Sequence, residues 1–394
     1  MKKKKRFWSH LKTVAIFGLL LIGILSSLIA ALNMRIPTQS AVPNQLSANE
    51  QHRITEAIHL RRTIGNQVWP GWSEVKIPFI LYNESHVFLA GSDIENTTAG
   101  WTRIPYNTNF GTEWNLVKDQ IRYYRQPLPE NGETPQAFVV QVGDQIAASM
   151  TTKEWTKINL VKLIKEDLPG FLKPIFPYQL FINKFDSDWH IASLIHESFH
   201  AFQAHQNYSR FENAEKMNSL HDLYPWSNPD FRHLWVEERK LMAKAIKEPK
   251  KIDAKELILE WLTVRETRRS YLDPKMITYE KEREWLEGLA KYAEIKSWQI
   301  ASDTTFYKPL DIVMDDPDFS SYQAAHNNYD KEILQLQSDL GFSESVFYYS
   351  GWAQAELLDR FYPNWKAVVM KSDIYFEELL KESMGTSNSG FTSK

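Results

Sequence analysis

The stretch DSDWHIASLIHESFHAFQAHQN, from Asp186 to Asn207, decides the fold of this chain. Asp186, Ser187 and Asp188 are of the residue types that cap helix N-termini. Apolar side chains follow them at the spacing of a helix that is buried on one side. These apolar positions are Ile191, Leu194, Ile195, Phe199 and Phe202. We therefore expect a capped and partly buried helix over residues 187–206.

Within this helix, His196, Glu197 and His200 form the pattern His-Glu-x-x-His. Residues four apart project from one helix face, so both imidazoles can bind one tetrahedral zinc ion. Glu197 lies beside them and is placed to take a proton from zinc-bound water. An ordinary helix with two structural histidines is the alternative, because short patterns also arise by chance. The capped apolar setting favours zinc, whereas we expect structural roles for His190 and His205, which lie off this face.

A catalytic zinc ion takes a third protein ligand, and the stretch WLEGLAKYAE (Trp285–Glu294) suggests one. It resembles the W-L-x-E-G-x-A-x-Y-x-E stretch of gluzincin metallopeptidases, notably the M1-type aminopeptidases, in which the Glu before Gly is the third ligand. The resemblance implies that Glu287 binds zinc with His196 and His200. It covers only two short stretches, Glu287 follows His200 by 87 residues instead of the family's shorter gap, and no G-x-M-E-N loop is present.

The residues themselves leave the third ligand open. Gly288 and Ala290 give the helix around Glu287 a thin face, across which a carboxylate can reach a metal on a neighbouring helix. Glu237 and Glu238, in LWVEERKLMAKAI, are the alternatives. Either of them is a candidate ligand or a hydrogen-bond partner that orients a ligand histidine.

Two further groups of residues have candidate roles. Zinc hydrolases stabilise the oxyanion with a Tyr or His donor, and for this role we choose Tyr349, with Tyr348 as the alternative. Arg265, Arg268 and Arg269 occur together in TVRETRRSYLDP. They can hold a substrate carboxylate, but such a cluster is more often a solvated helix face paired with acids.

The N-terminus predicts a membrane anchor. Five basic residues, Lys2–Arg6, precede TVAIFGLLLIGILSSLIAAL (Thr13–Leu32), which contains no charged residue. An apolar helix of about 20 residues spans a bilayer core. Basic residues stay in the cytoplasm, which would place the remaining chain outside the cell membrane. A cleaved signal peptide is the alternative and would make the body a secreted protein.

Composition narrows the classes of function. The 394 residues carry a net charge of −3, which argues against a nucleic-acid partner. The absence of cysteine excludes disulfides, thiolate-bound zinc and cysteine nucleophiles. The sequence also lacks the G-x-S-x-G, G-x-x-x-x-G-K-[ST] and G-x-G-x-x-G motifs, so serine hydrolase, P-loop and dinucleotide functions have no support.

Periodicity predicts an α+β chain that is mainly helical. Hairpins are expected in KIPFILYNESHVFLAG and AFVVQVGDQIAASM, with a loop-rich segment over 91–114. Helices are expected near 187–206, 230–247, 253–271, 276–298, 318–339, 343–361 and 370–383. The expected organisation is a basic segment (1–12), anchor (13–32), linker (33–50), α/β part (51–170), helical zinc-binding part (171–385) and tail (386–394).

Together these features predict a zincin-like fold, in which a small N-terminal β-sheet lies over a helical catalytic region. The predicted function is that of a membrane-anchored, extracytoplasmic zinc hydrolase, most consistently a peptidase that acts on a peptide or protein substrate. One alternative is a catalytically inactive zincin-like surface protein that binds or senses a ligand. Another is hydrolysis of a non-peptide amide, because the metal chemistry is the same. Cleavage specificity and oligomeric state do not follow from the sequence.

Overall fold

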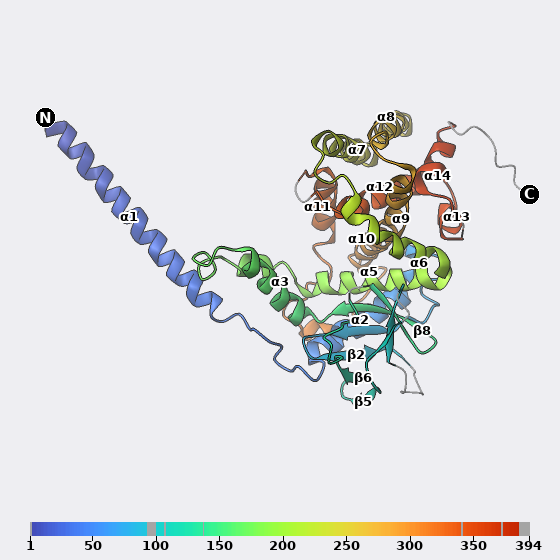
Figure 1. Cartoon of the computed structure of the whole chain (residues 1–394), viewed down its shortest axis with the longest axis horizontal. Helices are drawn as coiled ribbons and strands as arrows, with labels where there is room; N and C mark the ends of the chain where they lie inside the picture. The colour runs from blue at the N-terminus through green and yellow to red at the C-terminus, as the bar shows by residue number, and fades with distance from the viewer. Residues whose placement is uncertain are drawn as a thin grey trace, which may run out of the picture.

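A computed structural model describes residues 2–92, 100–105, 108–136, 138–339, 342–371 and 373–385, and the side chains of these residues except 2–16, 19 and 138. Figure 1 shows a long N-terminal helix that projects from the body, a sheet on one side of the body and helices on the other. The chain is α+β and mainly helical, as expected. The expected tail at 386–394 lies outside the described residues.

The sheet is larger than the small sheet that we expected. Its described strands follow the order β4-β3-β7-β8-β1-β2-β6-β5, and neighbours are antiparallel except the parallel pair β1 and β8. The strands are β1 (Phe79–Tyr82), β2 (His86–Ala90), β3 (Trp101–Arg103), β4 (Asn109–Phe110), β5 (Asn115–Lys118), β6 (Arg122–Pro127), β7 (Phe138–Val142) and β8 (Gln145–Thr151).

Both predicted hairpins are confirmed, as β1–β2 and β7–β8. The expectation of a loop over 91–114 is wrong in part, because β3 and β4 lie there. These strands have two or three residues each, too few to show an alternating pattern. In β1, Phe79 and Leu81 face the main core, while Ile80 and Tyr82 face a second core on the opposite side of the sheet. This alternation is the two-residue period of a strand that is buried on both faces.

The first helices of the body are α2 (Ala48–Val68), which begins inside the expected linker, α3 (Lys153–Asp167) and α4 (Gln179–Ile182). The central helix α5 (Ser187–Gln206) has the predicted bounds, and α6 (Tyr208–Lys216) and the 3₁₀ turn η1 (Met217–Leu223) follow it. The remaining helices are α7 (Pro229–Lys247), α8 (Lys251–Arg269), α9 (Pro274–Arg283), η2 (Glu284–Gly288), α10 (Leu289–Ala301), η3 (Asp311–Asp315), α11 (Ala325–Gln337), α12 (Ser345–Phe361), α13 (Trp365–Lys371) and α14 (Phe376–Ser383).

Two helix predictions are wrong in their extent. The helix expected from 318 begins only at Ala325, because Ser321 and Tyr322 have positive φ angles of 55° and 60°. Asp188 fixes this turn by accepting hydrogen bonds from the backbone N–H groups of Ser320 and Tyr322. The helix expected over 370–383 is divided into α13 and α14, because extended backbone at Tyr375 starts a new helix.

Helix α5 lies between the sheet and the other helices, as Figure 1 shows. It contacts β7 and β8 of the sheet and the helices α10 and α2. Ile191, Leu194, Ile195, Phe199 and Phe202 are all at most 1% exposed and belong to the main core. The predicted apolar face of this helix is therefore buried, and the candidate site residues of α5 are held in the middle of the molecule.

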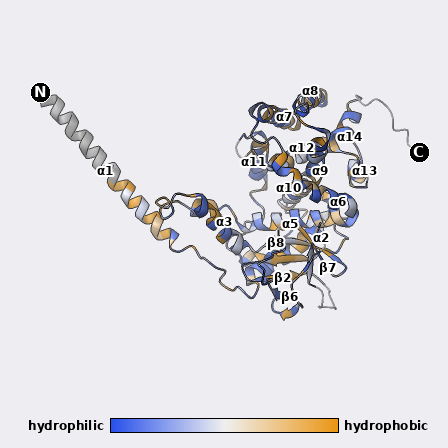
Figure 2. Ribbon diagram, in the orientation of Figure 1, coloured by the Kyte–Doolittle hydropathy of each residue, from blue (hydrophilic) through white to orange (hydrophobic). Residues whose placement is uncertain are grey.

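The projecting helix α1 (Lys2–Asn33) contains the expected anchor. Its described apolar side chains are mostly exposed, and the ribbon of its described part is mostly coloured as hydrophobic in Figure 2. The expected anchor, Thr13–Leu32, falls partly on positions 13–16 and 19, whose side chains lie outside the described part. Among the side chains that are described, no helix has an apolar run long enough to cross a membrane.

Candidate metal centre

Helix α5 carries both histidines and Glu197 into the core. Asp186 caps this helix and accepts a hydrogen bond from the backbone N–H of Trp189 at 2.7 Å. The imidazole rings of His196 and His200 face the same region, with centroids 4.9 Å apart. His200 is fully buried and His196 is 7% exposed. A neutral or charged imidazole at this depth needs a partner, because burial removes its hydration.

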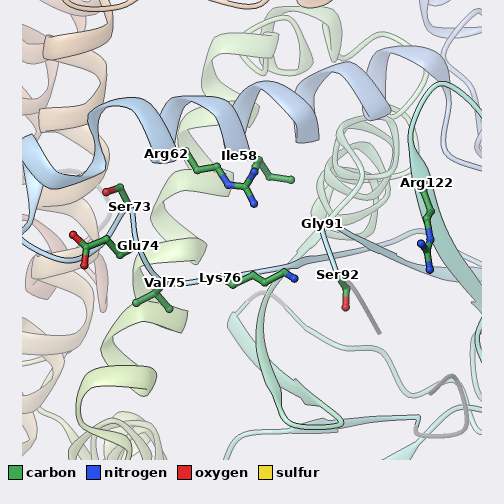
Figure 3. Close-up of a pocket in the computed structure, with 9 residues that line it drawn as sticks. All are labelled: Ile58, Arg62, Ser73, Glu74, Val75, Lys76, Gly91, Ser92 and Arg122. Atoms are coloured by element: carbon green, nitrogen blue, oxygen red, sulfur yellow. The ribbon is translucent and has the colours of Figure 1, made fainter. Parts of the chain in front are cut away.

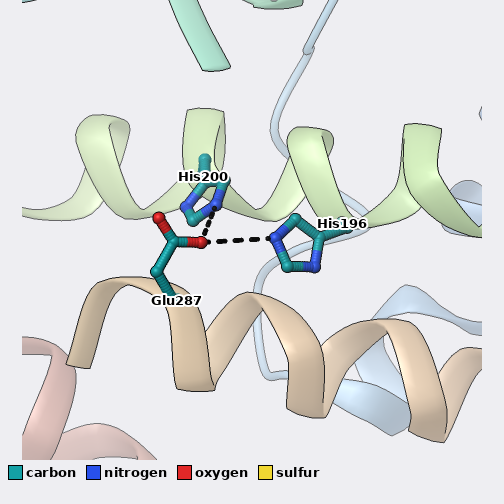
Figure 4. A group of neighbouring side chains, drawn as sticks. All are labelled: His196, His200 and Glu287. Carbon is teal, nitrogen blue, oxygen red and sulfur yellow. Dashed lines mark ion pairs between the residues drawn. The ribbon is translucent and has the colours of Figure 1, made fainter. Parts of the chain in front are cut away.

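Glu287 comes from a second helix, at a turn where that helix widens. This turn, η2, is π-helical, a rare form that often occurs at functional sites. A Cβ atom on Gly288 would lie only 2.4 Å from Gly351 Cα on α12. The two glycines therefore let η2 and α12 approach backbone to backbone, and Figure 4 shows Glu287 directed from η2 towards α5.

His196, His200 and Glu287, here called the histidine–glutamate cluster, converge at one point (Figure 4). Glu287 Oε2 is 3.3 Å from His200 Nε2 and 3.6 Å from His196 Nε2. One ligand atom from each residue lies within 4.8 Å of the others. Tetrahedral zinc with bonds near 2.0–2.1 Å separates its ligand atoms by roughly 3.3–3.4 Å. The two measured distances therefore fit a metal site of this kind.

The nitrogen and oxygen atoms of this cluster are also of the types that bind divalent metals. Glu287 Oε2 is buried and accepts no well-aligned hydrogen bond from the described residues. A buried carboxylate oxygen in a folded protein normally has a partner. Two imidazole nitrogens and one carboxylate oxygen suit zinc, and other first-row divalent metals also bind such a set.

The second nitrogen of each imidazole is fixed by a hydrogen bond. His196 Nδ1 lies 3.0 Å from Glu294 Oε2, and His200 Nδ1 lies 2.9 Å from Gln203 Oε1. Donation from Nδ1–H leaves Nε2 free of its proton, which is the tautomer that binds a metal. Both rings are therefore oriented with Nε2 towards Glu287.

Further contacts fix the position of the Glu287 carboxylate. Gln203 Nε2 donates to the backbone carbonyls of Trp285 and Leu286 at 3.0 and 3.2 Å, which ties α5 to the π-helical turn. Arg283 Nη2 donates to Glu287 Oε1 at 2.7 Å. Because Oε1 is held by Arg283, only Oε2 of Glu287 is directed to the histidines, and a metal would be bound by one oxygen.

The carboxylates set the protonation of the cluster. Burial opposes the charged imidazole of His196, but Glu287 and Glu294 outweigh burial and raise its pKa to about 10. Burial also opposes the Glu287 carboxylate, but Arg283 and His200 hold its pKa well below the usual range. Without a metal, the protonated imidazole of His196 thus carries a positive charge between the carboxylates of Glu287 and Glu294. A divalent cation would supply that charge instead.

Glu197 is half-buried beside the cluster and makes few polar contacts. Burial, together with the negative charges of Glu287 and Glu294, raises its pKa to about 8 against the opposing effect of His196. Its Oε2 atom has no hydrogen-bond partner among the described residues. A carboxylate with a pKa near neutrality can exchange a proton at physiological pH, which is what a general base requires.

The two candidate tyrosines lie in different surroundings. The Tyr348 ring stacks on His196, with centroids 5.7 Å apart and an interplanar angle of 11°. Burial raises the pKa of Tyr348 well above its usual value, and the nearby Glu287 carboxylate adds to this. Tyr349, which we chose from the sequence, instead packs on Trp352 and Lys291. The structure therefore places Tyr348, and not Tyr349, against the cluster.

The other sequence candidates have structural partners. Glu238 forms ion pairs with Arg265 and Arg268, and Glu237 is exposed, so the structure brings neither to the histidines. The expectation of a solvated arginine face is wrong, because Arg265 and Arg268 are at most 1% exposed. His190 Nε2 lies 3.2 Å from the carbonyl of Thr151.

Four residues near the cluster were not found from the sequence. Arg283, Glu294 and Gln203 act on the cluster as described above. Glu294 lies seven residues after Glu287, which places both on one helix face, so this spacing was an available signal. Glu215 on α6 is 8% exposed. Burial, together with the charges of Glu287 and Glu197, raises its pKa to about 7 against the opposing effect of Arg283.

Two cavities differ in their relation to the cluster. The cavity drawn in Figure 3 has a volume of about 410 Å³ and includes Arg62, Lys76 and Arg122, but none of the cluster residues. A second cavity, of about 350 Å³, is lined by Glu215 and by residues from both the sheet and the segment after α5. None of the cluster residues lines this second cavity, but Glu215, on which the charges of Glu287 and Glu197 act, does.

Comparison with known proteins adds no relative from which a function could be transferred. No family model matches the chain, and no curated protein and no solved structure is detectably similar to it.

Proposed function

We propose that this protein is a zinc-dependent hydrolase and, more specifically, a peptidase. One observation carries the proposal: two imidazole Nε2 atoms and one carboxylate oxygen converge in the core, with the carboxylate of Glu197 on the same helix. The orienting hydrogen bonds from Glu294 and Gln203 support it, because ligand histidines usually donate their second N–H to such groups. The buried Oε2 atom of Glu287, which accepts no well-aligned hydrogen bond from the described residues, also supports it.

Each residue has a separate role in this proposal. His196 and His200 would hold the zinc ion through Nε2, and Glu287 would hold it through Oε2. When bound, zinc supplies polarisation of a carbonyl group and lowers the pKa of a water molecule. Glu197 accepts the proton of the attacking water and donates it to the leaving amine. Tyr348, rather than Tyr349, donates a hydrogen bond to the oxygen that becomes negatively charged.

The choice of a peptide substrate rests on the resemblance of Trp285–Glu294 to gluzincins and on the place of the sheet. A zincin-like arrangement is proposed because α5 packs directly on β7 and β8. A peptide in extended form could add to the β3–β4 side of the sheet, next to the second cavity. Backbone hydrogen bonds would then align its scissile bond with Glu197.

We also propose that α1 anchors the protein in the cell membrane with the body outside. The uncharged run Thr13–Leu32 after Lys2–Arg6 supports this orientation. The apolar side chains of Phe17, Leu21 and Ile24 are 66–68% exposed on the projecting helix. Exposed apolar side chains of this kind need an apolar environment.

Metal analysis of the full-length chain in detergent tests the first part of the proposal. We expect about one zinc ion per chain in the wild type and none in His196→Ala. Glu197→Gln should keep its zinc, since Glu197 is not a ligand. His205→Ala is the matched control, because His205 lies on the same helix and is exposed. Equal zinc contents in the wild type and His196→Ala would contradict the site.

Digestion of a peptide library tests catalysis. The zinc-loaded wild type and His205→Ala should cleave peptides, and Glu197→Gln should be slower by roughly 10²–10⁴-fold, the usual contribution of a general base. Zinc binding without cleavage of any peptide would instead favour the surface protein that binds or senses a ligand. Cleavage of non-peptide amides alone would keep the hydrolase and exclude the peptidase.

A further inference from the structure

We propose that Glu215 determines substrate specificity by binding the cationic head of a lysine or arginine side chain of the substrate. This inference rests on the proposed function, because it assigns a substrate class to the same site. It concerns the second cavity, here called the Glu215 cavity. This cavity is lined by Arg103, Ile104, Pro105, Pro135, Gln136, Val139, Glu215, Lys216, Asn218 and Ser219.

The first observation is an acidic side chain that is buried without a full set of partners. Glu215 is 8% exposed, and its Oε1 atom has no hydrogen-bond partner among the described residues. Leaving a buried carboxylate without a partner is costly. Because Glu215 also lines a cavity, a group that enters the cavity can approach its carboxylate.

The second observation is that the cations near Glu215 already have acidic partners. Lys216 Nζ lies 2.9 Å from Glu212 Oε2, and Arg103 is paired with Glu133. Arg283, which also interacts electrostatically with Glu215, forms ion pairs with Glu287 and Glu344. The charge that is left for a ligand in this cavity is therefore negative, and a cationic ligand complements it.

The third observation concerns the walls of the cavity. Ile104, Pro105, Pro135 and Val139 are apolar and come from the sheet side, opposite Glu215 on α6. Lysine and arginine side chains have an apolar stem and a charged head. The apolar walls complement the apolar stem, and the carboxylate complements the charged head. A ligand with an amino group but no apolar stem would contact only the carboxylate.

The position of the cavity relates it to the cluster. Asn207 is both the C-cap of α5 and the N-cap of α6, so α6 follows the metal-binding helix without a loop. The charges of Glu287, Glu197 and His200 all act on Glu215. A side chain in the Glu215 cavity would therefore belong to a residue close to the scissile bond.

Paired substrates test the inference. N-acetylated peptides that differ only in lysine or norleucine at one position have the same stem, and acetylation removes the N-terminal amine. For the zinc-loaded wild type we expect kcat/KM to favour lysine by roughly 10–100-fold, the usual effect of a hydrogen bond to a charged group. In Glu215→Gln this preference should disappear. The preference for lysine should remain in Asp222→Asn, which removes an exposed acid on η1, the 3₁₀ turn that follows α6.

A binding measurement separates this inference from the proposed function. The same peptides are titrated into zinc-loaded Glu197→Gln, with and without Glu215→Gln, and binding is followed by fluorescence anisotropy. Tighter binding of the lysine peptide that depends on Glu215 supports the inference even if the wild type cleaves nothing, in which case only the peptidase proposal fails. Cleavage with equal kcat/KM for both peptides overturns the inference and keeps the peptidase. Equal binding of both peptides without any cleavage overturns both.

Discussion

Two buried clusters of charged side chains share the π-helical turn η2 but differ in completeness. The first is the histidine–glutamate cluster, to which η2 contributes Glu287. The second is an arginine–glutamate network, to which η2 contributes Glu284. This network consists of Arg265, Arg268, Arg269, Glu238, Glu280, Glu284 and Glu377.

In the network, arginines and acids from five elements satisfy one another. Arg265 alone reaches Glu238, Glu284 and Glu377. Charge-assisted hydrogen bonds of this kind compensate for the loss of hydration. In the histidine–glutamate cluster, by contrast, three atoms that can each bind a metal face one another. The comparison indicates that each carboxylate of the network has an arginine partner within the chain, whereas for the cluster we propose a bound cation as the partner.

The largest expected effect follows from breaking the network. Arg268→Met would leave the buried carboxylates of Glu238 and Glu280 without their shared cation. We expect the free energy of unfolding to fall by about 3–5 kcal/mol, measured by urea denaturation. Arg232→Met is the control, because Arg232 pairs with Asp339 at the surface and should lose only about 0–1 kcal/mol. Equal losses in both variants would mean that the network does not stabilise the fold.

Zinc should stabilise the protein through the cluster and not through the network. At free zinc about one hundred times Kd, the free energy of unfolding should rise by about 2.7 kcal/mol. His200→Ala should show no such gain, and Arg232→Met should show all of it. Because His196 must lose its proton to bind zinc, and its pKa is raised to about 10, the gain should decrease as the pH falls. Equal gains in His200→Ala would place the zinc elsewhere.

Gly288→Ala should affect both clusters at once. The new Cβ would lie 2.4 Å from Gly351 Cα and 2.6 Å from its carbonyl carbon, so η2 and α12 must separate. We expect a loss of about 1–3 kcal/mol in unfolding free energy, as in other overpacked cores. Zinc affinity should fall as well, because Glu287 moves with the turn. Gly170→Ala, where no atom lies within 4 Å of the added Cβ, should change neither quantity.

The difference between local and long-range contacts explains which features could be predicted from the sequence. The helix with His196, Glu197 and His200 depends on local spacing and capping, and its bounds were predicted correctly. Glu287 was chosen through the resemblance of Trp285–Glu294 to the gluzincin stretch, whereas the residues themselves left Glu237 and Glu238 open. The strands β3 and β4 were missed, because two or three residues do not show a period of two.

The contacts that complete each cluster were not predictable in the same way. The three arginines of α8 resemble a solvated face because the acids that pair with them come from α7, α9, η2 and α14. Glu215 was missed for a related reason: its burial depends on how α6 packs, which no local pattern specifies. Tyr348 and Tyr349 are neighbours in sequence, and only the rotation of α12 decides which one meets His196.

The smallest effect should come from the group that orients His196 without binding the metal. Glu294→Gln replaces the carboxylate that accepts from His196 Nδ1 at 3.0 Å. A neutral amide holds the required tautomer less strongly, and we expect roughly tenfold weaker zinc binding, about 1.4 kcal/mol, the lower limit for such partners. Competition with a zinc chelator measures this change.

A matched variant separates this role from a structural one. Glu294 also accepts a hydrogen bond from Lys291 at 2.8 Å, and Glu332 contacts the same lysine at 3.0 Å. Glu332→Gln therefore weakens the contacts of Lys291 while the partner of His196 remains. If both variants weaken zinc binding equally, the charge of Lys291 and its partners matters rather than the orientation of His196. If only Glu294→Gln does so, the cluster depends on the orientation of its imidazole, a requirement that the self-contained arginine–glutamate network does not have.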